Sequence, residues 1–420
     1  MNSSFFKTHQ KLMYWLLIVQ LLTFELIVAG TTTYELLKGT TIRFENIIGL
    51  IVASVLVAMI ILVRHYENKW LRSSNKLVKF FMEIYYIVMT LVLMFSILPT
   101  ENIFVMGALH KWLHLNVTAV FVLLFIYGIF MYIPTIAVIT KNIKWVVSRV
   151  LMMALVLFQL VGMYSFYSSM DMGNKTLSML ENTGIVGAVA FAVMISVLMI
   201  EWGFRLPKFS FSKNSSWSTN LFLLLFAAWY VIYNAFAYSE KLSTTLFKYD
   251  FSVKSPTWHM AFQGLEAGIA EEWLWRFAVG LLLLFAFKNS KHSFLRRYFI
   301  EWSVGIGGLL FGLWHFDNMF AGQNVLGTVD QMLSAAAAGW LFMVIYFYTN
   351  NLLSTIVFHF LIDALSFIAS GTTFMDKPNL FEWETTVIQI IVFGLITVFM
   401  LTGKRRKVIK ENVSGMLERS

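Results

Sequence analysis

The sequence predicts an all-α, polytopic integral membrane protein with about twelve transmembrane helices. Three observations lead to this fold class. Of the 420 residues, 58% are hydrophobic and only 13% are charged, the mean hydropathy is +0.71, and basic residues concentrate between long apolar runs. This composition excludes a soluble domain. The 17% aromatic content and the five prolines exclude a disordered or collagen-like chain.

The apolar runs mark the expected membrane spans in chain order. A helix needs roughly 20 residues to cross a hydrocarbon core of about 30 Å. Runs of suitable length lie near residues 14–30, 47–63, 80–98, 116–139, 145–167, 184–203, 219–238, 260–287, 299–316, 327–348, 352–370 and 384–402. In the first seven, Glu25 and Glu83 are the main ionisable residues, and we expect both to make interhelical hydrogen bonds.

Charge placement predicts the orientation of these spans. If the N-terminus lies inside, the segments assigned to the cytoplasm hold most of the 32 Lys and Arg residues, as the positive-inside rule requires. Both chain ends are therefore expected in the cytoplasm, and the protein in the cell membrane as a multi-pass protein. Membrane anchoring accounts for the net charge of +9, so the lipid bilayer is an expected partner and nucleic acid is not.

Polar residues inside the membrane define the expected domains. Residues 1–255 form an N-terminal region of seven expected spans without a predicted role, and Ser255-Pro256 marks a plausible break. Residues 256–403 form a second module, in which ionisable residues enter the spans. Residues 404–420 form a basic cytoplasmic tail of the stop-transfer type.

The expected span 260–287 carries Glu271, Glu272 and Arg276 at its middle. An ionised residue at this depth costs at least a few kcal/mol unless it is paired or hydrated. The i,i+4 spacing of Glu272 and Arg276 predicts a salt bridge on one helical face. Glu271 is then the unpaired carboxylate. Neighbouring helical positions differ by about 100°, so both glutamates are expected to border one cavity in different roles.

Two histidines follow on later spans. His315 ends the sequence Phe311-Gly-Leu-Trp-His315, and His359 stands four residues before Asp363, on the same helical face. Glu271 and His315 both lie about 24 Å from the expected cytoplasmic boundary, whereas His359 lies only about 11 Å from it. We therefore expect the uncharged turn 349–351 to lie sunken within the protein, which would bring His359 level with the other two.

These patterns, Glu-Glu-x-x-x-Arg, Phe-x-x-x-His and His-x-x-x-Asp on successive spans, resemble those of the CPBP family of intramembrane proteases. That family includes type II CAAX prenyl endopeptidases and bacteriocin-processing or self-immunity proteins. The resemblance covers roughly residues 256–400. The roles that it implies are water activation for Glu271, support for Glu272 and Arg276, a second water contact for His315, and oxyanion binding for His359 and Asp363.

Two cofactor hypotheses stay open. We favour a water activated by glutamate without a metal, because the chain has no His-Glu-x-x-His motif and Arg276 would add positive charge beside a dication. The alternative is zinc held by Glu271, His315 and His359, since a zinc-bound water is nucleophilic near neutral pH. The absence of cysteine excludes thiol nucleophiles and Cys-ligated metal sites.

The expected function is hydrolysis of a peptide bond in a membrane-embedded or membrane-associated peptide or protein. The alternative is a catalytically silent immunity or regulatory partner that keeps the motifs as a polar packing network. A transporter would show inverted repeats and broken helices, and the sequence shows neither. Gly308-x-x-x-Gly312 and the small residues 335–339 are expected to serve helix packing.

Overall fold

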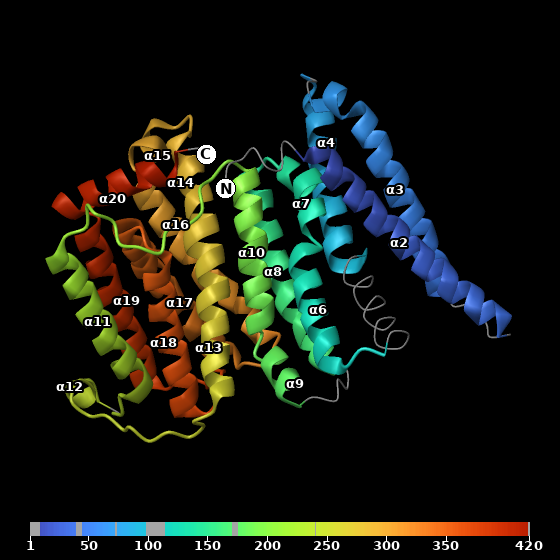
Figure 1. The fold of residues 1–420 in the computed structure, drawn as a ribbon. Coiled ribbons are helices and arrows are strands. Elements are labelled where there is room, and N and C mark those ends of the chain that lie inside the picture. Colours follow the sequence, from blue (N-terminus) through green and yellow to red (C-terminus); the bar gives the residue numbers. More distant parts are fainter. Residues whose placement is uncertain are drawn as a thin grey trace. The chain divides into compact units, whose positions relative to one another are not determined.

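The computed structural model describes residues 9–38, 44–71, 74–97, 114–169, 175–239 and 241–418, and these residues form an all-helical fold (Figure 1). Within them, one isolated β-bridge pairs Ala237 with Tyr249. The chain divides into two compact units. Unit 1 contains residues 1–178, 193–203 and 420, and unit 2 contains residues 179–192 and 204–419.

Unit 1 is built from the N-terminal helices. Its elements are α2 (Gln10–Leu37), α3 (Phe44–Leu71), α4 (Lys76–Val92), the π-helical turn η1 (Leu93–Ile97), α6 (Val117–Phe130), α7 (Ile133–Val138), the 3₁₀ turn η2 (Thr140–Asn142) and α8 (Val146–Ser169). Helices α9 (Lys175–Glu181) and α10 (Ile185–Glu201) have residues in both units.

Buried Glu83 joins two helices of unit 1. Its carboxylate accepts hydrogen bonds from the backbone N–H groups of Lys144 and Trp145 at 2.9 to 3.1 Å. These donors stand at the N-terminus of α8, where a negative charge is favourable. The predicted hydrogen-bonding role of Glu83 is confirmed.

Unit 2 contains every candidate site residue. Its elements are α11 (Trp217–Phe236), α12 (Leu242–Thr245), α13 (Trp258–Glu271), the π-helix η3 (Glu272–Val279), α14 (Gly280–Lys288), α15 (Ser293–Arg297), α16 (Phe299–Trp314), the 3₁₀ turn η4 (His315–Met319), α17 (Val325–Thr349), α18 (Leu352–Ser370), α19 (Leu380–Met400) and α20 (Gly403–Met416).

Among the described residues, seven helices are long and apolar enough to cross a membrane. They are Gln10–Tyr34, Lys76–Phe95, Trp217–Phe236, Phe299–Met319, Val325–Thr349, Leu352–Ser370 and Leu380–Met400. The all-α membrane class is confirmed, but a count of twelve spans is not. Other expected spans appear as shorter apolar helices, such as Ile185–Glu201. The helical run from Trp258 to Lys288 carries several ionisable residues, which make it less apolar than a simple span.

The turn 349–351 is covered by two other segments of unit 2. Its lack of charged residues predicted that it would be buried. Thr349 is only 2% exposed, and its carbonyl accepts a hydrogen bond from Ser212 N at 2.7 Å. Asn412 of α20 donates to the carbonyl of Tyr348 at 2.6 Å. The expected burial of the turn is confirmed, and His359 is itself buried, at 7% exposed.

The basic tail also packs against the rest of unit 2. On α20, Ile409, Val413 and Met416 are buried, and Arg406 forms an ion pair with Glu301 at 2.7 Å. Helix α20 therefore covers one end of unit 2, which we call the basic end (Figure 1). Its basic residues are Arg205, Lys208, Lys213, Lys288, Lys291, Arg296, Arg297 and those of the segment 404–410.

The opposite end of unit 2 is formed by loops that bond to one another. Ser255 N donates to the carbonyl of Ile368 at 3.1 Å, and Met375 N donates to Gln323 Oε1 at 2.9 Å. Helix α12 lies at this end (Figure 1). We call this end of unit 2 the loop end.

Glycines let α13 and α18 approach closely. A Cβ added to Gly264 would lie 2.5 Å from the backbone N of Ala364, and one added to Gly268 would lie 3.0 Å from the carbonyl oxygen of Ile356. A real Cβ atom would clash with the backbone at 2.5 Å, so residue 264 must be a glycine for the helices to pack this closely. This Gly-x-x-x-Gly pair, one turn before Glu271, holds the two glutamates against α18.

A second glycine pair packs α16 against α17. A Cβ on Gly308 would lie 2.2 Å from the Trp340 ring, and one on Gly312 would lie 2.4 Å from the carbonyl oxygen of Met332. On α17, Gly339 lies against Gly308 itself. The predicted packing role of these small residues is confirmed.

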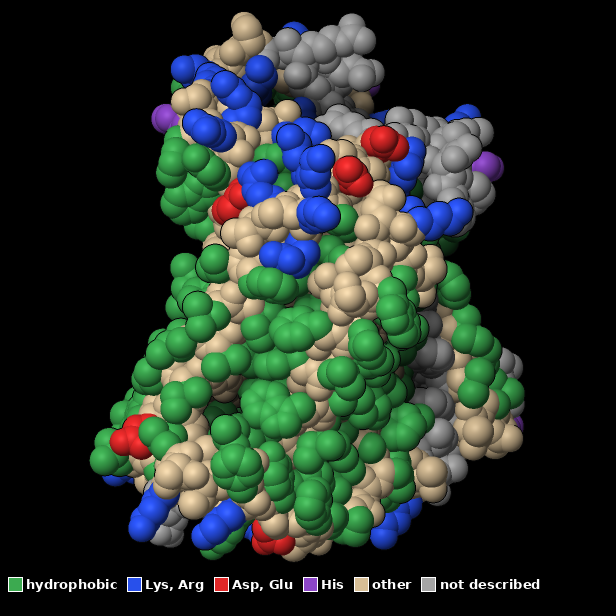
Figure 2. Space-filling model, turned by 90° about the vertical axis from the view of Figure 1, so that its left-hand side faces the viewer, with side chains coloured by type: hydrophobic (Ala, Val, Ile, Leu, Met, Phe, Trp, Pro, Cys, Tyr) green, Lys and Arg blue, Asp and Glu red, His purple; other side chains and the backbone are tan. Residues whose placement is uncertain are grey.

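Hydrophobic side chains cover the middle of the face that carries α11 and α19, and Lys and Arg gather toward the basic end (Figure 2). Leu225 is 61% exposed and Leu395 is 65% exposed. Apolar side chains this exposed over several turns suit contact with lipid rather than water.

Candidate active site

A π-helix begins at the second glutamate of the motif. The expected span 260–287 is helical throughout, from Trp258 after the Thr257 N-cap to Lys288. The π-helical stretch Glu272–Val279 was not predicted, because hydropathy does not report the hydrogen-bond register. Such stretches occur often at functional sites, since they reorient side chains within an otherwise regular helix.

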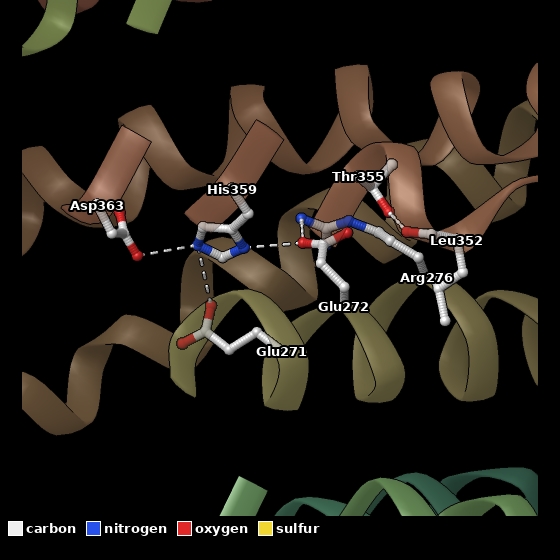
Figure 3. Close-up of polar contacts among 7 residues, drawn as sticks. All are labelled: Glu271, Glu272, Arg276, Leu352, Thr355, His359 and Asp363. Atoms are coloured by element: carbon white, nitrogen blue, oxygen red, sulfur yellow. Dashed lines mark hydrogen bonds and ion pairs between the residues drawn. The ribbon is translucent and has the colours of Figure 1, made fainter. Parts of the chain in front are cut away.

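His359 of α18 is the centre of the polar cluster (Figure 3). Its Nδ1 lies 2.9 Å from Glu272 Oε1. Its Nε2 lies 3.2 Å from Asp363 Oδ2 and 3.8 Å from Glu271 Oε2. The first and third motifs thus supply one contiguous cluster, in which a single imidazole contacts three carboxylates.

Arg276 balances part of this negative charge. Its Nη2 lies 3.0 Å from Glu272 Oε1, and both side chains are fully buried. The guanidinium also stacks over the ring of Phe311, at 4.1 Å from the centroid, and near that of Phe342, at 5.1 Å. The predicted i,i+4 salt bridge is confirmed, and two aromatic faces complete the surroundings of the cation.

The geometry fixes where protons must lie. A carboxylate oxygen only accepts hydrogen bonds, and both ring nitrogens of His359 face carboxylate oxygens. Hydrogen bonds on both sides therefore require one proton more than a neutral imidazole carries, held by His359 itself, by Glu272 or by Asp363. In each of these states, Glu272, His359 and Asp363 share two protons.

The two glutamates differ in their access to solvent. The Glu271 side chain is 15% exposed and that of Glu272 is 0% exposed. Glu271 Oε2 has no hydrogen-bond partner among the described residues. This difference agrees with different roles for the two glutamates. The expectation that both border one cavity is not confirmed, because neither lines the cavity whose wall contains His359 and Asp363.

His315 lies beside His359 rather than beside the glutamates. Both imidazoles contact the ring of Phe311, at centroid distances of 5.1 Å for His315 and 6.0 Å for His359. Among the described residues, His315 makes no hydrogen bond or ion pair with Glu271 or Glu272. Glu271 and His315 were expected to hold one water together. In the structure no hydrogen bond or ion pair joins them, and His359 lies next to both.

Glu266 is a further ionisable residue of the cluster that the motifs did not single out. It lies on α13, five residues before Glu271, within electrostatic range of Glu271, Asp363 and His359. The signal was available in the sequence, because Glu266 falls inside the expected span 260–287.

The donor set predicted for zinc was Glu271, His315 and His359. Among the residues that the structure describes, no group of three or more His, Asp or Glu side chains is arranged to hold a metal ion. Both ring nitrogens of His359 are already directed at carboxylates. These side chains do not fit a zinc site as they are arranged.

A cavity of about 500 Å³ leads to the cluster. His315, His359 and Asp363 lie in its wall, and so do Ser370 and the segment 372–376 at the loop end. The cluster is therefore reached from the loop end of unit 2 and not from the basic end.

The comparisons with known proteins agree with the motifs. Residues 253–365 match the family model of the Rce1-like type II CAAX prenyl endopeptidases. No curated protein and no solved structure matches the chain. The matched segment contains all six predicted site residues. Residues 253–365 therefore form a domain of the CPBP, or CAAX protease, family, as the three motifs predicted.

Proposed function

We propose that the protein is an intramembrane endopeptidase that hydrolyses a peptide bond with a water molecule activated by Glu271. The observation that carries this proposal is the side chain of Glu271, which is 15% exposed and has its Oε2 3.8 Å from His359 Nε2. A carboxylate with a free oxygen next to an imidazole can accept a proton from water. The family of residues 253–365 supports the same reaction class.

The proposed reaction proceeds through a tetrahedral intermediate. Glu271 takes a proton from water, and the oxygen of that water forms a bond to the carbonyl carbon of the substrate. His359 Nε2–H, held next to Asp363, stabilises the developing oxyanion. Glu271 then gives its proton to the leaving amine as the C–N bond breaks. His315, on the same aromatic ring as His359, is positioned to contact the water or the substrate.

Glu272 and Arg276 serve as positioning residues in this proposal. Glu272 Oε1 contacts both Arg276 and His359, so it fixes the orientation of the imidazole. Neither side chain is exposed, and neither touches the cavity. The mechanism as proposed uses no metal.

The proposed substrate is a peptide or protein in or on the membrane. We further propose that the basic end of unit 2 and both chain ends lie in the cytoplasm, following the positive-inside rule, and that the protein is a multi-pass protein of the cell membrane.

The test is cleavage of a membrane peptide library by the purified full-length protein, with mass spectrometry of the products. New C-termini that appear with the wild-type protein and not with Glu271→Gln support an endopeptidase. If neither protein yields new termini, the silent immunity or regulatory partner becomes the better explanation.

A further inference from the structure

The charge of the cavity wall is strongly one-sided. Asp330, Asp363, Asp376 and Glu382 line it. Within the part of the chain that the structure describes, no Lys or Arg lines it. The protein as a whole is basic, with a net charge of +9, so this acidic wall is a local feature.

Hydrogen bonds hold two of these carboxylates in place. Thr386 Oγ1 donates to Asp330 Oδ1 at 2.6 Å, and the backbone N of Asn379 donates to Glu382 Oε2 at 2.6 Å. Each carboxylate still has a second oxygen for another donor. The acidic groups thus stand at fixed positions on α17 and α19, along the route from the loop end to His359.

The rest of the wall carries polar and apolar side chains in similar measure. Its amides and hydroxyls include Asn234, Gln331, Ser334, Ser366, Thr385 and Gln389. Its apolar side chains include Phe311, Phe342, Ile362, Phe367, Phe374 and Met375, and the rings of Phe311 and Phe342 lie next to His359. The apolar side chains can contact hydrophobic parts of a peptide, and the carboxylates can pair with its Lys or Arg side chains.

We propose that the cavity receives a peptide segment that carries Lys or Arg close to the bond to be cut. The inference rests on the proposed peptidase function of the same site and names its substrate class. A cleft lined by one sign of charge concentrates ligands of the opposite sign.

Binding to the full-length Glu271→Gln protein tests this inference without requiring hydrolysis. The probes are fluorescent peptides of one Ala/Ser sequence that carry lysines, glutamines or glutamates at the same positions, and a farnesylated form of the glutamine peptide. In nonionic detergent, the lysine peptide should bind on the order of tenfold more tightly than the glutamine peptide. Nonspecific attraction to a protein of net charge +9 would favour the glutamate peptide instead.

Two matched variants locate the effect in the cavity. In the same Glu271→Gln background, Glu382→Gln removes a charge from the wall and keeps a side chain able to cap α19. Glu384→Gln makes the same change two residues later, outside the cavity. We expect only Glu382→Gln to weaken binding of the lysine peptide, by several-fold.

Equal binding of the three unmodified peptides, tightest binding of the farnesylated peptide, or equal effects of the two variants would each overturn the inference. If the lysine peptide is preferred but the wild-type protein cuts no peptide, the charge preference stands and the peptidase proposal fails. The two failures are therefore distinguishable.

Discussion

His359 and Glu272 are joined by a 2.9 Å contact between Nδ1 and Oε1, and they come from two different helices. The same carboxylate oxygen lies 3.0 Å from Arg276. Glu272 is thus a fully buried link between the cation and the imidazole. The Oε2 atoms of Glu271 and Glu272 both have no hydrogen-bond partner among the described residues, but only the Glu271 side chain is partly exposed, at 15%. This difference supports separate roles for the two neighbouring residues.

The first prediction concerns that separation. Glu272→Gln should lower the free energy of unfolding by about 3 to 5 kcal/mol, because Arg276 would remain buried without a negative partner. Glu271→Gln should melt close to the wild-type temperature, since Glu271 Oε2 has no hydrogen-bond partner. Thermal melting in detergent measures both. Equal melting temperatures for the two variants would contradict the division of roles.

The second prediction concerns the contact between α13 and α18. Gly264→Ala should cost about 1 to 3 kcal/mol of stability and reduce activity, because the new methyl group would press on the backbone of Ala364 and move the glutamates away from His359. Gly305→Ala is the matched control, since nothing lies within 4 Å of its added Cβ. That control should be neutral or stabilising by up to about 1 kcal/mol. Similar losses in both variants would argue against this packing.

The third prediction concerns orientation, and the cysteine-free chain makes the test direct. A single cysteine at Lys377, on the loop end, should react with an impermeant maleimide on intact cells or spheroplasts. A single cysteine at Lys291, on the basic end, should react only after the membrane is opened. Both positions are exposed. The reverse pattern would show that the cavity opens toward the cytoplasm.

The fourth prediction concerns Asp363 and zinc. If Asp363 serves the oxyanion side with His359, Asp363→Asn should retain or raise activity, because the amide supplies a permanent N–H donor. If Asp363 held zinc, the same change should lower activity, with recovery in excess metal. Chelator-treated wild-type protein, verified metal-free by elemental analysis, should stay active. Zinc-restorable loss in both assays would overturn the metal-free mechanism.

Much of the arrangement followed from sequence patterns with a direct physical cause. The i,i+4 spacing predicted the Glu272–Arg276 salt bridge, and depth arithmetic predicted the burial of the turn 349–351. Both rest on helix geometry alone, which a sequence determines well.

The remaining features depend on tertiary contacts that spacing does not encode. The position of His359 between Glu271 and Glu272 follows from the close approach of α13 to α18, and the π-helix that begins at Glu272 leaves no hydropathy signal. The packing of α20 was missed because its basic residues dominate its composition. The count of twelve spans is not confirmed, because several of the expected spans form helices that are shorter or carry more ionisable residues than the seven long apolar helices among the described residues.

The most direct test of the central claim is the cleavage rate of Glu271→Gln on a peptide that the wild-type protein cuts. The amide keeps the shape of the side chain but cannot take the proton of the water. The control is Glu301→Gln, the same change at a partly exposed ion pair with Arg406 at the basic end, where full activity is expected. The account predicts that Glu271→Gln loses about a hundredfold or more in rate while it melts like the wild type. Wild-type turnover by a folded Glu271→Gln protein would contradict it.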